Sequence, residues 1–328
     1  MRFIVYGVGA IGGVIASRLF QSGHQVVLIA RGAHFDAIRR SGLRLETPTA
    51  TAVLPIPVVD HPGAVEWTSD DVVLLAMKGQ DTPDAVSALA RVAPPATPIF
   101  CAQNGVENER TALRWFSRVY GVAVVFPASH LEPGVVQAFS SPLTGLLDLG
   151  RWPRGTDEVA AAAAAALTAS TFNSRAIPDI ARWKYAKLLS NLGNACEAIC
   201  GPSARRGQLS DLTRREGEAC LRAAGIDFAS AAEDAERRGD LLSRQPVAGQ
   251  ARGGSSSWQS LARRAGSIET DYLNGEIALL GRLYDVPTPL NALLCRLANE
   301  MARRGTPPGG MTPEEVLAQL DHATSMST

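Results

Sequence analysis

Three glycines, Gly7, Gly9 and Gly12, follow the first apolar run of this 328-residue chain, and their spacing is typical of a phosphate-binding turn. Gly7 would permit a tight turn out of a strand, and Gly9 would let the backbone approach a pyrophosphate without an intervening Cβ. Gly12 would let a following helix pack closely on a sheet. Turns with this spacing bind the phosphates of dinucleotides, so the candidate cofactor-binding residues are Gly7, Gly9, Ala10, Ile11 and Gly12.

The residues on either side of the glycines indicate whether this spacing belongs to a dinucleotide-binding turn. Residues 2–6 are short, apolar and rich in β-branched side chains, residues 13–22 follow a helical pattern, and residues 25–29 predict a second strand. Together they form the strand–turn–helix–strand unit of a Rossmann-type dinucleotide-binding domain, which disfavours a glycine-rich turn of another kind.

The end of the second predicted strand indicates which dinucleotide the turn would hold. An NAD site usually places Asp or Glu about 20 residues past the turn. Residues 28–32 contain no carboxylate and include Arg31. A guanidinium can bind a 2′-phosphate through paired hydrogen bonds, whereas an acid would repel it. Arg31 therefore favours NADP(H), with a solvated arginine at the start of the next loop as the alternative.

Two further polar side chains follow buried strands. Lys78 comes directly after the apolar run of residues 72–77, and Asn104 follows the run of residues 99–102. Because ligands of open α/β sheets bind at the carboxyl ends of the strands, both side chains are expected near the glycine turn. An exposed loop lysine and an ordinary Asn-Gly turn are the alternatives.

The second half of the chain carries two polar clusters that a purely structural helix would not favour. Within residues 184–194, Lys187 and Asn191 lie four residues apart and would share a helix face, although Asn has a poor helix propensity. Within residues 253–271, Ser257 precedes Glu269 by one predicted helix. Helix capping by the serines and a solvent-facing Glu269 are the alternatives for the second cluster.

Length and periodicity predict two domains. A chain of 328 residues exceeds one ordinary core, and strand-like runs stop near Ile177, so we expect domains at residues 1–177 and 178–328. The predicted fold class is an α/β N-terminal Rossmann-type dinucleotide-binding domain followed by an all-α C-terminal domain. Residues 134–139 and 146–149 are predicted to extend the sheet. Helices are predicted over residues 180–199, 209–224, 228–238, 256–265, 268–284 and 290–303.

Charge and cysteine content disfavour several classes of partner. Lys+Arg and Asp+Glu are both 32, which gives no indication of a surface for nucleic acid, and no apolar run reaches bilayer length. The five cysteines lack CxxC and disulfide-framework spacing, which indicates a reducing cytoplasm and no metal site. The first strand begins at the N-terminus, so no signal peptide is expected. The helical domain could form a homodimer, but no feature demands one.

Beyond these separate motifs, the sequence resembles the ketopantoate reductase (2-dehydropantoate 2-reductase) family over nearly its whole length. The shared features are the glycine turn, the strand-end Lys78 and Asn104, and a helix motif of the form KLxxN at residues 187–191. Two later runs are also similar. One is the serine pair 256–257 followed by Glu-Thr-Asp-Tyr-Leu-Asn-Gly at residues 269–275, and the other is Val-Pro-Thr-Pro-Leu-Asn at residues 286–291.

The resemblance implies NADPH-dependent reduction of a small 2-oxo acid to a 2-hydroxy acid, with 2-dehydropantoate in pantothenate biosynthesis as the first expectation. It implies that Lys187 is the catalytic lysine and that Asn104 and Asn191 hold the oxo acid. It further implies that Ser257 binds the substrate carboxylate. Glu269 would belong to the cofactor or proton-transfer network, and the residues expected to contact NADP(H) then include Lys78, Asn104 and Glu269.

The chemistry of the reaction agrees with a lysine in this role. Hydride transfer to a 2-oxo carbon builds negative charge on the carbonyl oxygen, which a nearby ammonium stabilises and then protonates. With an ordinary pKa near 10.4, the amine of Lys187 would start as the acid at neutral pH.

The substrate half of the motif departs from the family pattern at four positions, which are Ala195, Gly254, Ser260 and Leu261. Two other interpretations stay open: a related reductase acting on a different oxo acid, and a non-catalytic NADP(H)-binding redox sensor. The sensor would use Arg31 but would have no need of Lys187 with Glu269. The arginine-rich segment 237–264 could guide an anionic substrate, although a solvated loop and helix face is favoured.

Overall fold

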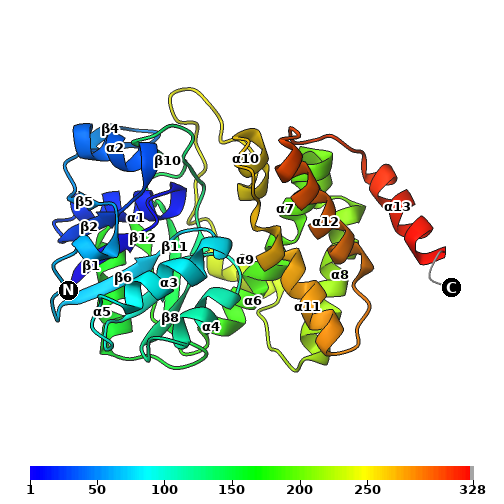
Figure 1. Cartoon of the computed structure of the whole chain (residues 1–328), viewed down its shortest axis with the longest axis horizontal. Coiled ribbons are helices and arrows are strands. Elements are labelled where there is room, and N and C mark those ends of the chain that lie inside the picture. Colours follow the sequence, from blue (N-terminus) through cyan, green and yellow to red (C-terminus); the bar gives the residue numbers. More distant parts are fainter. Residues whose placement is uncertain (326–328) are drawn as a thin grey trace. The chain divides into compact units, whose positions relative to one another are not determined.

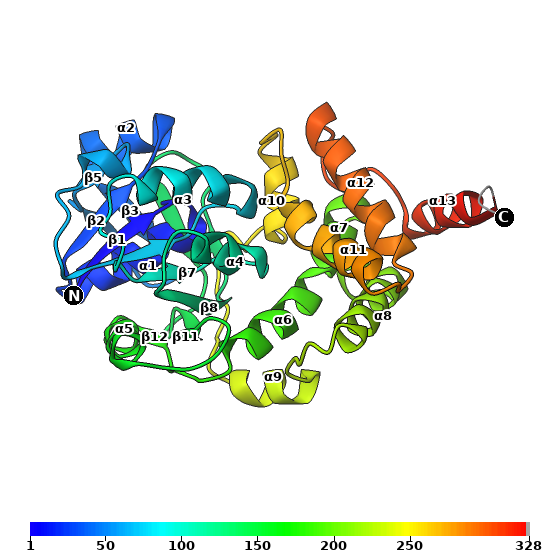
Figure 2. The ribbon, with the colours of Figure 1, turned by 60° about the horizontal axis from the view of Figure 1, so that its bottom comes forward.

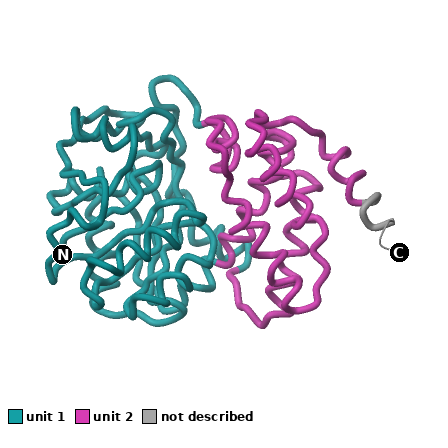
Figure 3. The backbone as a smooth tube through the Cα atoms, viewed as in Figure 1, with its two compact units in different colours: residues 1–184, 230–252 teal, residues 185–229, 253–328 magenta. Residues whose placement is uncertain are grey.

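The structure, a computed structural model, describes residues 1–325 and divides the chain into two compact units (Figure 3). Unit 1 contains Met1–Lys184 and Ser230–Arg252, and unit 2 contains Tyr185–Ala229 and the chain from Gly253 onward. The first segment of unit 1 therefore ends at Lys184, inside a helix, whereas the sequence predicted the domain boundary at Ile177. Within the described residues, no helix is both long enough and apolar enough to cross a membrane.

The main sheet of unit 1 has the strand order β12-β11-β8-β7-β6-β1-β2-β5 (Figure 1). Neighbouring strands run parallel, except that β11 is antiparallel to β8. The strands are β1 (Arg2–Tyr6), β2 (Val26–Ile29), β5 (Val58–Val59), β6 (Asp71–Leu75), β7 (Ile99–Cys101), β8 (Val119–Val125), β11 (Gly145–Arg151) and β12 (Phe172–Asn173).

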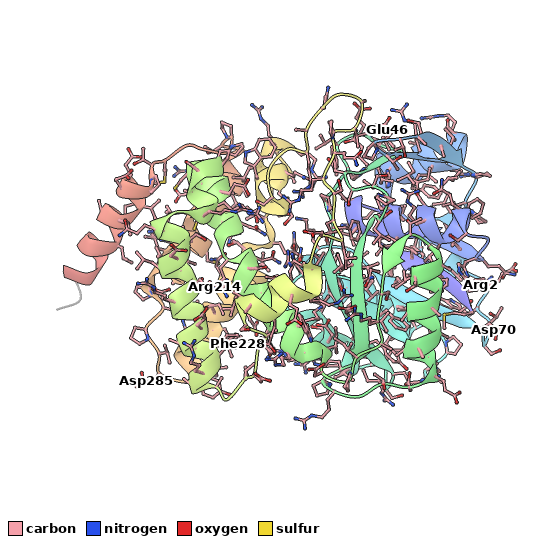
Figure 4. The ribbon with its side chains drawn as sticks, turned by 180° about the vertical axis from the view of Figure 1, so that it is seen from behind. Arg2, Glu46, Asp70, Arg214, Phe228 and Asp285 are labelled. Carbon is pink, nitrogen blue, oxygen red and sulfur yellow. The ribbon has the colours of Figure 1, made fainter. Side chains whose placement is uncertain are left out.

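The ends of three neighbouring strands are in register at one edge of this sheet. Tyr6 of β1 pairs with Leu75 of β6, and Leu75 pairs in turn with Cys101 of β7. At the amino-terminal edge, Arg2 and Asp70 lie close together (Figure 4), and the Arg2 backbone N–H donates to the Asp70 carbonyl over 2.8 Å. The carboxyl ends of β1, β6 and β7 therefore meet at one edge, as expected for a ligand-binding edge of a parallel sheet.

Each face of the main sheet carries its own apolar core, because successive strand side chains point to opposite faces. Phe3 and Val5 pack with helices α1 (Ala10–Gln21), α2 (Gly32–Ser41) and α5 (Glu158–Ala169). Ile4 packs on the other face with α3 (Thr82–Ala90) and α4 (Glu107–Leu113). Burial on both faces explains why β6 is a continuous apolar run after its first residue. Two short 3-10 helices also belong to unit 1, η1 (Pro62–Ala64) and η2 (Gly79–Asp81).

A second sheet corrects one prediction about the strands. Its order is β4-β3-β10-β9, formed by β3 (Leu43–Glu46), β4 (Thr51–Leu54), β9 (Ala128–Ser129) and β10 (Val135–Ala138). Residues 134–139 therefore do not extend the main sheet, whereas residues 146–149 do, as part of β11. The cause is packing on α1, because Val136 lies so near that helix that a Cβ at Gly13 would be 2.6 Å from its Cγ1.

The helical part of the chain begins with α6 (Ile180–Asn191), which is labelled in Figure 2. This helix starts in unit 1 and ends in unit 2. The predicted helix over residues 180–199 is two helices, because a new helix, α7 (Gly193–Cys200), begins after Leu192. A Cβ at Gly193 would lie 2.5 Å from the Ser210 hydroxyl oxygen, so the break coincides with a close approach to the next helix. The remaining elements of unit 2 are η3 (Pro202–Arg206), α8 (Gln208–Ala223), α10 (Ser256–Ala262), η4 (Glu269–Tyr272), α11 (Asn274–Leu283), α12 (Pro289–Arg304) and α13 (Pro313–Ser325).

One helical segment, residues 230–252, packs with unit 1 although the sequence assigned it to the helical domain. It contains α9 (Ala231–Arg238), whose Arg237 side chain is 8% exposed and forms an ion pair with Asp148 of β11 over 2.6 Å. Arg237 also donates to the Asn173 side chain over 2.8 Å. At the start of α9, Glu233 pairs with Arg182 over 2.9 Å. The interpretation of the arginine-rich segment as a solvated face is therefore wrong for Arg237, which is a structural cation.

Candidate active site

The glycine turn has the close packing that a nucleotide-binding turn requires. Gly7 has a φ of +94°, and a Cβ there would lie 2.5 Å from the backbone nitrogen of Met77. A Cβ at Gly12 would lie 2.1 Å from the carbonyl oxygen of Gly7, so α1 packs against the turn itself. A Cβ at Gly9, in contrast, would meet no protein atom within 4 Å. The protein's own packing thus requires two of the glycines, whereas Gly9 keeps the approach to the turn open.

This opening fits the cofactor that the sequence predicts. Ala10 and Ile11 form the first turn of α1, and no side chain caps the amides there. Unpaired N–H groups at the start of a helix of this length favour an anion, and the open space at Gly9 lets the anion reach them. The turn therefore has both the donors and the room that a pyrophosphate needs.

A histidine that sequence reasoning missed supports the same turn. The Nε2 atom of His34 lies 2.7 Å from the carbonyl oxygen of Val8, and the backbone N–H of Gly134 donates to Nδ1 over 2.8 Å. A carbonyl can only accept and an amide N–H can only donate, so the ring is neutral with its proton on Nε2. Burial, with a smaller effect of His130, lowers the pKa of His34 to about 4. Its position on α2 gives no spacing signal that links it to the turn.

Arg31 precedes α2 at the carboxyl end of β2. Its side chain is 81% exposed, and its guanidinium lies 3.0 Å from Oδ1 of Asp81, in η2. An ion pair this exposed contributes about 0–1 kcal/mol, so Arg31 can exchange Asp81 for a stronger anion at little cost. The position and charge of Arg31 agree with a contact to a ribose phosphate.

Lys78 and Asn104 follow the paired ends of β6 and β7, and a buried chain of hydrogen bonds connects their backbones. The Gln103 amide donates to the carbonyl oxygen of Met77 over 3.0 Å and to the Thr82 hydroxyl over 2.8 Å. That hydroxyl donates to Asn108, and Asn108 donates to the carbonyl oxygen of Asn104, both over 2.8 Å. The two strand-end loops are thus held together by side chains that the sequence analysis did not select.

A buried ion pair fixes the same loop to the first half of α6. Lys184 donates to Glu109 of α4 and to the carbonyl oxygen of Gln103, the latter over 3.0 Å. The exposed fractions of the two charged side chains are 2% and 0%. Burial raises the pKa of Glu109, although Lys184 opposes the rise. Within unit 1, Lys184 therefore ties the first half of α6 to the loop that precedes Asn104.

The predicted catalytic residues of the helical region lie on α6 in unit 2. Lys187 is half-buried, and its carbonyl oxygen accepts a hydrogen bond from Ser190 over 2.9 Å. Asn191 is 3% exposed and lies on the same face of the helix, four residues later. An asparagine buried in this way explains a residue of poor helix propensity at the end of α6.

Ser257 and Glu269 are both buried in unit 2, with exposed fractions of 1% and 3%. The cap of α10 is Ser255, which accepts from the Trp258 backbone N–H over 3.3 Å, so capping does not account for Ser257. Burial likewise excludes the interpretation of Glu269 as a solvent-facing residue. Asp271, two residues after Glu269, instead accepts a hydrogen bond from Asn299 over 2.6 Å.

Two asparagines of the family-like motifs have a structural role in unit 2. Asn274 donates to the carbonyl oxygen of Leu192 over 3.3 Å, at the break between α6 and α7, and to Asn291 over 3.0 Å. Asn291 donates in turn to the carbonyl oxygen of Thr213 over 3.0 Å and to Glu216 over 2.8 Å. These contacts hold the end of the Lys187 helix against the rest of the unit.

The predicted site residues therefore form two groups. The glycine turn, Arg31, Lys78 and Asn104 belong to unit 1, at the carboxyl ends of its parallel strands. The others, in unit 2, are Lys187, Asn191, Ser257 and Glu269. Among residues 1–325, no cluster of three or more His, Cys, Asp or Glu side chains could hold a metal ion.

Comparison with protein families decides what this arrangement belongs to. The family model described as ketopantoate reductase PanE/ApbA matches residues 3–153, and its C-terminal counterpart matches residues 179–302. The chain belongs to the ketopantoate reductase family. The protein is accordingly an oxidoreductase that acts on oxo acids, and its N-terminal α/β and C-terminal helical parts are those of a ketopantoate reductase.

Relatives of known name cover nearly the whole of this ketopantoate reductase family member. The 2-dehydropantoate 2-reductase of Pyrococcus horikoshii is 26% identical over 304 residues, which is 90% of this chain and 96% of that protein. The enzyme of the same name from Caulobacter vibrioides is 28% identical over 313 residues, 91% of this chain and 98% of that protein.

Solved structures of other proteins have the same fold. A PanE/ApbA family ketopantoate reductase from Ralstonia eutropha JMP134 is 28% identical, with a TM-score of 0.77 over 93% of this chain and 99% of that one. A ternary structure of D-mandelate dehydrogenase with NADH and anilino(oxo)acetate is 21% identical, with a TM-score of 0.79 over 93% of this chain and 99% of that one. At that identity the second likeness establishes the fold alone.

Proposed function

We propose that this protein reduces 2-dehydropantoate to pantoate with NADPH, as a step of pantothenate biosynthesis. The observation that carries the proposal is the face of α6 that bears half-buried Lys187 and buried Asn191. A nucleotide-binding sensor would have no need of an amine and a buried amide at this spacing. The glycine turn, with its open approach at Gly9, supplies the other half of such an enzyme.

In this proposal, Gly7, Gly9 and Gly12 would hold NADPH, which would supply a hydride to C2 of the oxo acid. The electron pair of the carbonyl π bond then moves to the carbonyl oxygen, and Lys187 Nζ donates a proton to that oxygen. Solvent returns the proton to the amine. Lys187 thereby stabilises the negative charge that develops on the carbonyl oxygen and then protonates that oxygen.

The other site residues bind and orient the substrate and cofactor. Asn104 and Asn191 hold the oxo acid, and Ser257 donates a hydrogen bond to its carboxylate. Lys78 and Asn104 also contact the cofactor. Buried Glu269 acts with Lys187 in proton transfer and in holding the nicotinamide end of the cofactor.

NADPH is preferred over NADH because residues 28–32 contain no acid and Arg31 lies at the end of β2. Complexes of D-mandelate dehydrogenase with NADH make NADH the alternative to be tested. All five cysteines of the chain are free thiols, which supports action in the reducing cytoplasm.

The proposal is tested by cofactor oxidation on addition of 2-dehydropantoate, trimethylpyruvate or phenylglyoxylate, with NADPH and NADH compared. Lys187→Ala should lower kcat about 10²- to 10⁴-fold, the usual contribution of a general acid. Ser190→Ala, on the exposed face of the same helix, is the matched control and should keep full activity. Tight NADPH binding with no turnover of any oxo acid would instead support the redox sensor. Undiminished activity of Lys187→Ala would remove Lys187 from its role.

A further inference from the structure

We propose that Asp81 is a specificity-determining residue for the cofactor and reduces the preference for NADPH that Arg31 creates. Asp81 competes with the 2′-phosphate of NADPH for Arg31, and its carboxylate accepts a hydrogen bond from the 2′-hydroxyl group of NADH. This inference rests on the proposed function, because it concerns the cofactor that the same site holds. Both residues belong to unit 1.

The ion pair of Arg31 with Asp81 joins two segments that are 50 residues apart in the chain. Arg31 follows β2, and Asp81 is the last residue of η2, which follows β6. Both strands pair with β1, because Tyr6 is in register with Ile29 on one side and with Leu75 on the other. The pair therefore lies at the strand ends that flank the glycine turn.

The carboxylate of Asp81 is not used to begin the next helix. An aspartate directly before a helix commonly accepts a hydrogen bond from the first backbone N–H groups of that helix. Asp81 occupies this position before α3, but its side chain forms no such bond. Oδ1 of Asp81 instead accepts a hydrogen bond from Nη2 of Arg31 over 3.0 Å. The side chain of Asp81 is 35% exposed, so a ligand can reach its carboxylate.

The surroundings of Arg31 contain more negative charge than a site for a 2′-phosphate needs. Burial raises the pKa of Tyr6, and Asp81 and Asp84 raise it further, whereas Arg31 opposes the rise. These three charged groups therefore act on one neighbourhood at the end of β1, where two carboxylates accompany one guanidinium. Carboxylates repel a phosphate group, which carries up to about two negative charges at neutral pH.

An acid at this position has a recognised use in dinucleotide-binding domains. A carboxylate near the end of the second strand accepts a hydrogen bond from the ribose 2′-hydroxyl of NAD(H). Residues 28–32 lack that acid, but Asp81 supplies a carboxylate to the same neighbourhood from the end of a different strand. Arg31 thus provides the contact that favours NADPH, and Asp81 provides the contact that favours NADH.

The ion pair also determines what each cofactor must displace. NADPH binds Arg31 only after Arg31 leaves Asp81, and the carboxylate then remains beside the phosphate. NADH leaves the pair in place. Because an exposed ion pair changes an equilibrium constant by at most about 5-fold, Asp81 reduces the preference for NADPH without reversing it.

Equilibrium binding of NADPH and NADH to Asp81→Asn tests the proposal, because the two cofactors differ only at the 2′ position. Isothermal titration calorimetry should give a dissociation constant for NADPH that is about 3- to 10-fold lower than that of the wild type. The dissociation constant for NADH should rise about 2- to 5-fold, because the amide is a weaker acceptor than the carboxylate. Added salt should diminish the change for NADPH, since the charges are exposed.

Asp70→Asn is the matched control. Asp70 is an exposed acid of the same unit at the amino-terminal edge of the sheet, so its replacement removes the same charge far from the glycine turn. Both dissociation constants should stay at their wild-type values in this variant. Asp81→Asn removes no capping bond and should unfold at the wild-type temperature, and Asp81→Ser replaces it if it folds poorly.

The outcomes separate the two proposals. Unchanged dissociation constants in Asp81→Asn, or equal changes for both cofactors, overturn the role of Asp81 and leave the reductase assignment intact. The expected changes in binding with no turnover of any 2-oxo acid overturn the reductase assignment and leave the role of Asp81 intact. Failure of the wild type to bind either cofactor overturns both.

Discussion

Replacement of Lys184 by methionine removes one partner of the buried ion pair that ties α6 to the Asn104 loop. Glu109 would keep no cation within hydrogen-bonding distance, and its Oε2 atom already lacks a partner in the described structure. Breaking a buried pair by removing one partner costs about 3–5 kcal/mol, because a buried charge is left uncompensated. We therefore expect Lys184→Met to lower the free energy of unfolding of unit 1 by about 3–5 kcal/mol near neutral pH.

The size of this loss should depend on pH. Burial raises the pKa of Glu109 above its ordinary value of 4.5, and Lys184 opposes that rise, so the pKa rises further in the variant. The folded state then binds more protons than the unfolded state. In the Lys184→Met variant, stability is therefore retained below the pKa that Glu109 has in the unfolded chain, and it is lost as the pH rises through the pKa that Glu109 has in the folded protein. The deficit of Lys184→Met relative to wild type should therefore be small below pH 4.5 and larger at neutral pH.

Urea unfolding followed by circular dichroism measures this deficit at several pH values. Lys184→Met/Glu109→Leu should recover most of the loss, because replacing both partners of a buried pair by apolar residues is often neutral. Arg182→Met is the control on the same helix, since its partner Glu233 is 44% exposed, and should cost at most about 1 kcal/mol. A deficit that is independent of pH, or a double variant as unstable as the single one, would refute the reasoning.

Three further predictions concern the cofactor-binding unit. Arg31→Ala should raise KM for NADPH with little effect on KM for NADH, as measured by steady-state kinetics. Arg40→Ala, in the helix that follows Arg31, is the control and should change neither KM. Gly9→Ala should fold with wild-type stability, because its Cβ would meet no protein atom, but should bind NADPH weakly, because that Cβ would occupy the approach to the turn. Gly12→Ala should instead lower the stability, because its Cβ would collide with the carbonyl oxygen of Gly7. Calorimetry of unfolding and of NADPH binding distinguishes the two variants. His34→Ala should weaken NADPH binding and flatten the pH dependence of the free energy of unfolding. Because the pKa of His34 is lowered from 6.5 to about 4 in the folded protein, its contribution to wild-type stability is present above pH 6.5 and is lost as the pH falls toward 4. Denaturation measured at several pH values tests this prediction.

The sequence predicted those parts of the fold that local pattern determines. The glycine turn between β1 and α1 is encoded in a few consecutive residues, and its steric reasons are visible in Gly7 and Gly12. The strand at residues 135–138 was recognised, but its sheet was not, because pairing with β3 depends on residues far away in the chain. The same limit applies to residues 230–252, whose attachment to unit 1 depends on Asp148.

The candidate site was predictable where it uses family motifs and hidden where it depends on tertiary contacts. Lys78, Asn104 and Lys187 stand at recognisable points of strands and helices. Lys184 and Glu109 are 75 residues apart, and no periodicity connects them. Glu197 has the sequence position of an ordinary helix residue, and only the structure shows that a Cβ at Gly254 would lie 2.8 Å from its Oε1 atom.

Hydride transfer from the bound cofactor to C2 of the oxo acid is the central claim, and isotope transfer measures it most directly. Wild-type protein would be incubated with 2-dehydropantoate and NADPH carrying two deuterium atoms at C4 of the nicotinamide, and the product examined by NMR and mass spectrometry. We predict one deuterium at C2 of pantoate, with the same product formed far more slowly by Lys187→Ala. Pantoate without deuterium at C2, or no hydroxy acid from any 2-oxo acid supplied, would contradict the assignment.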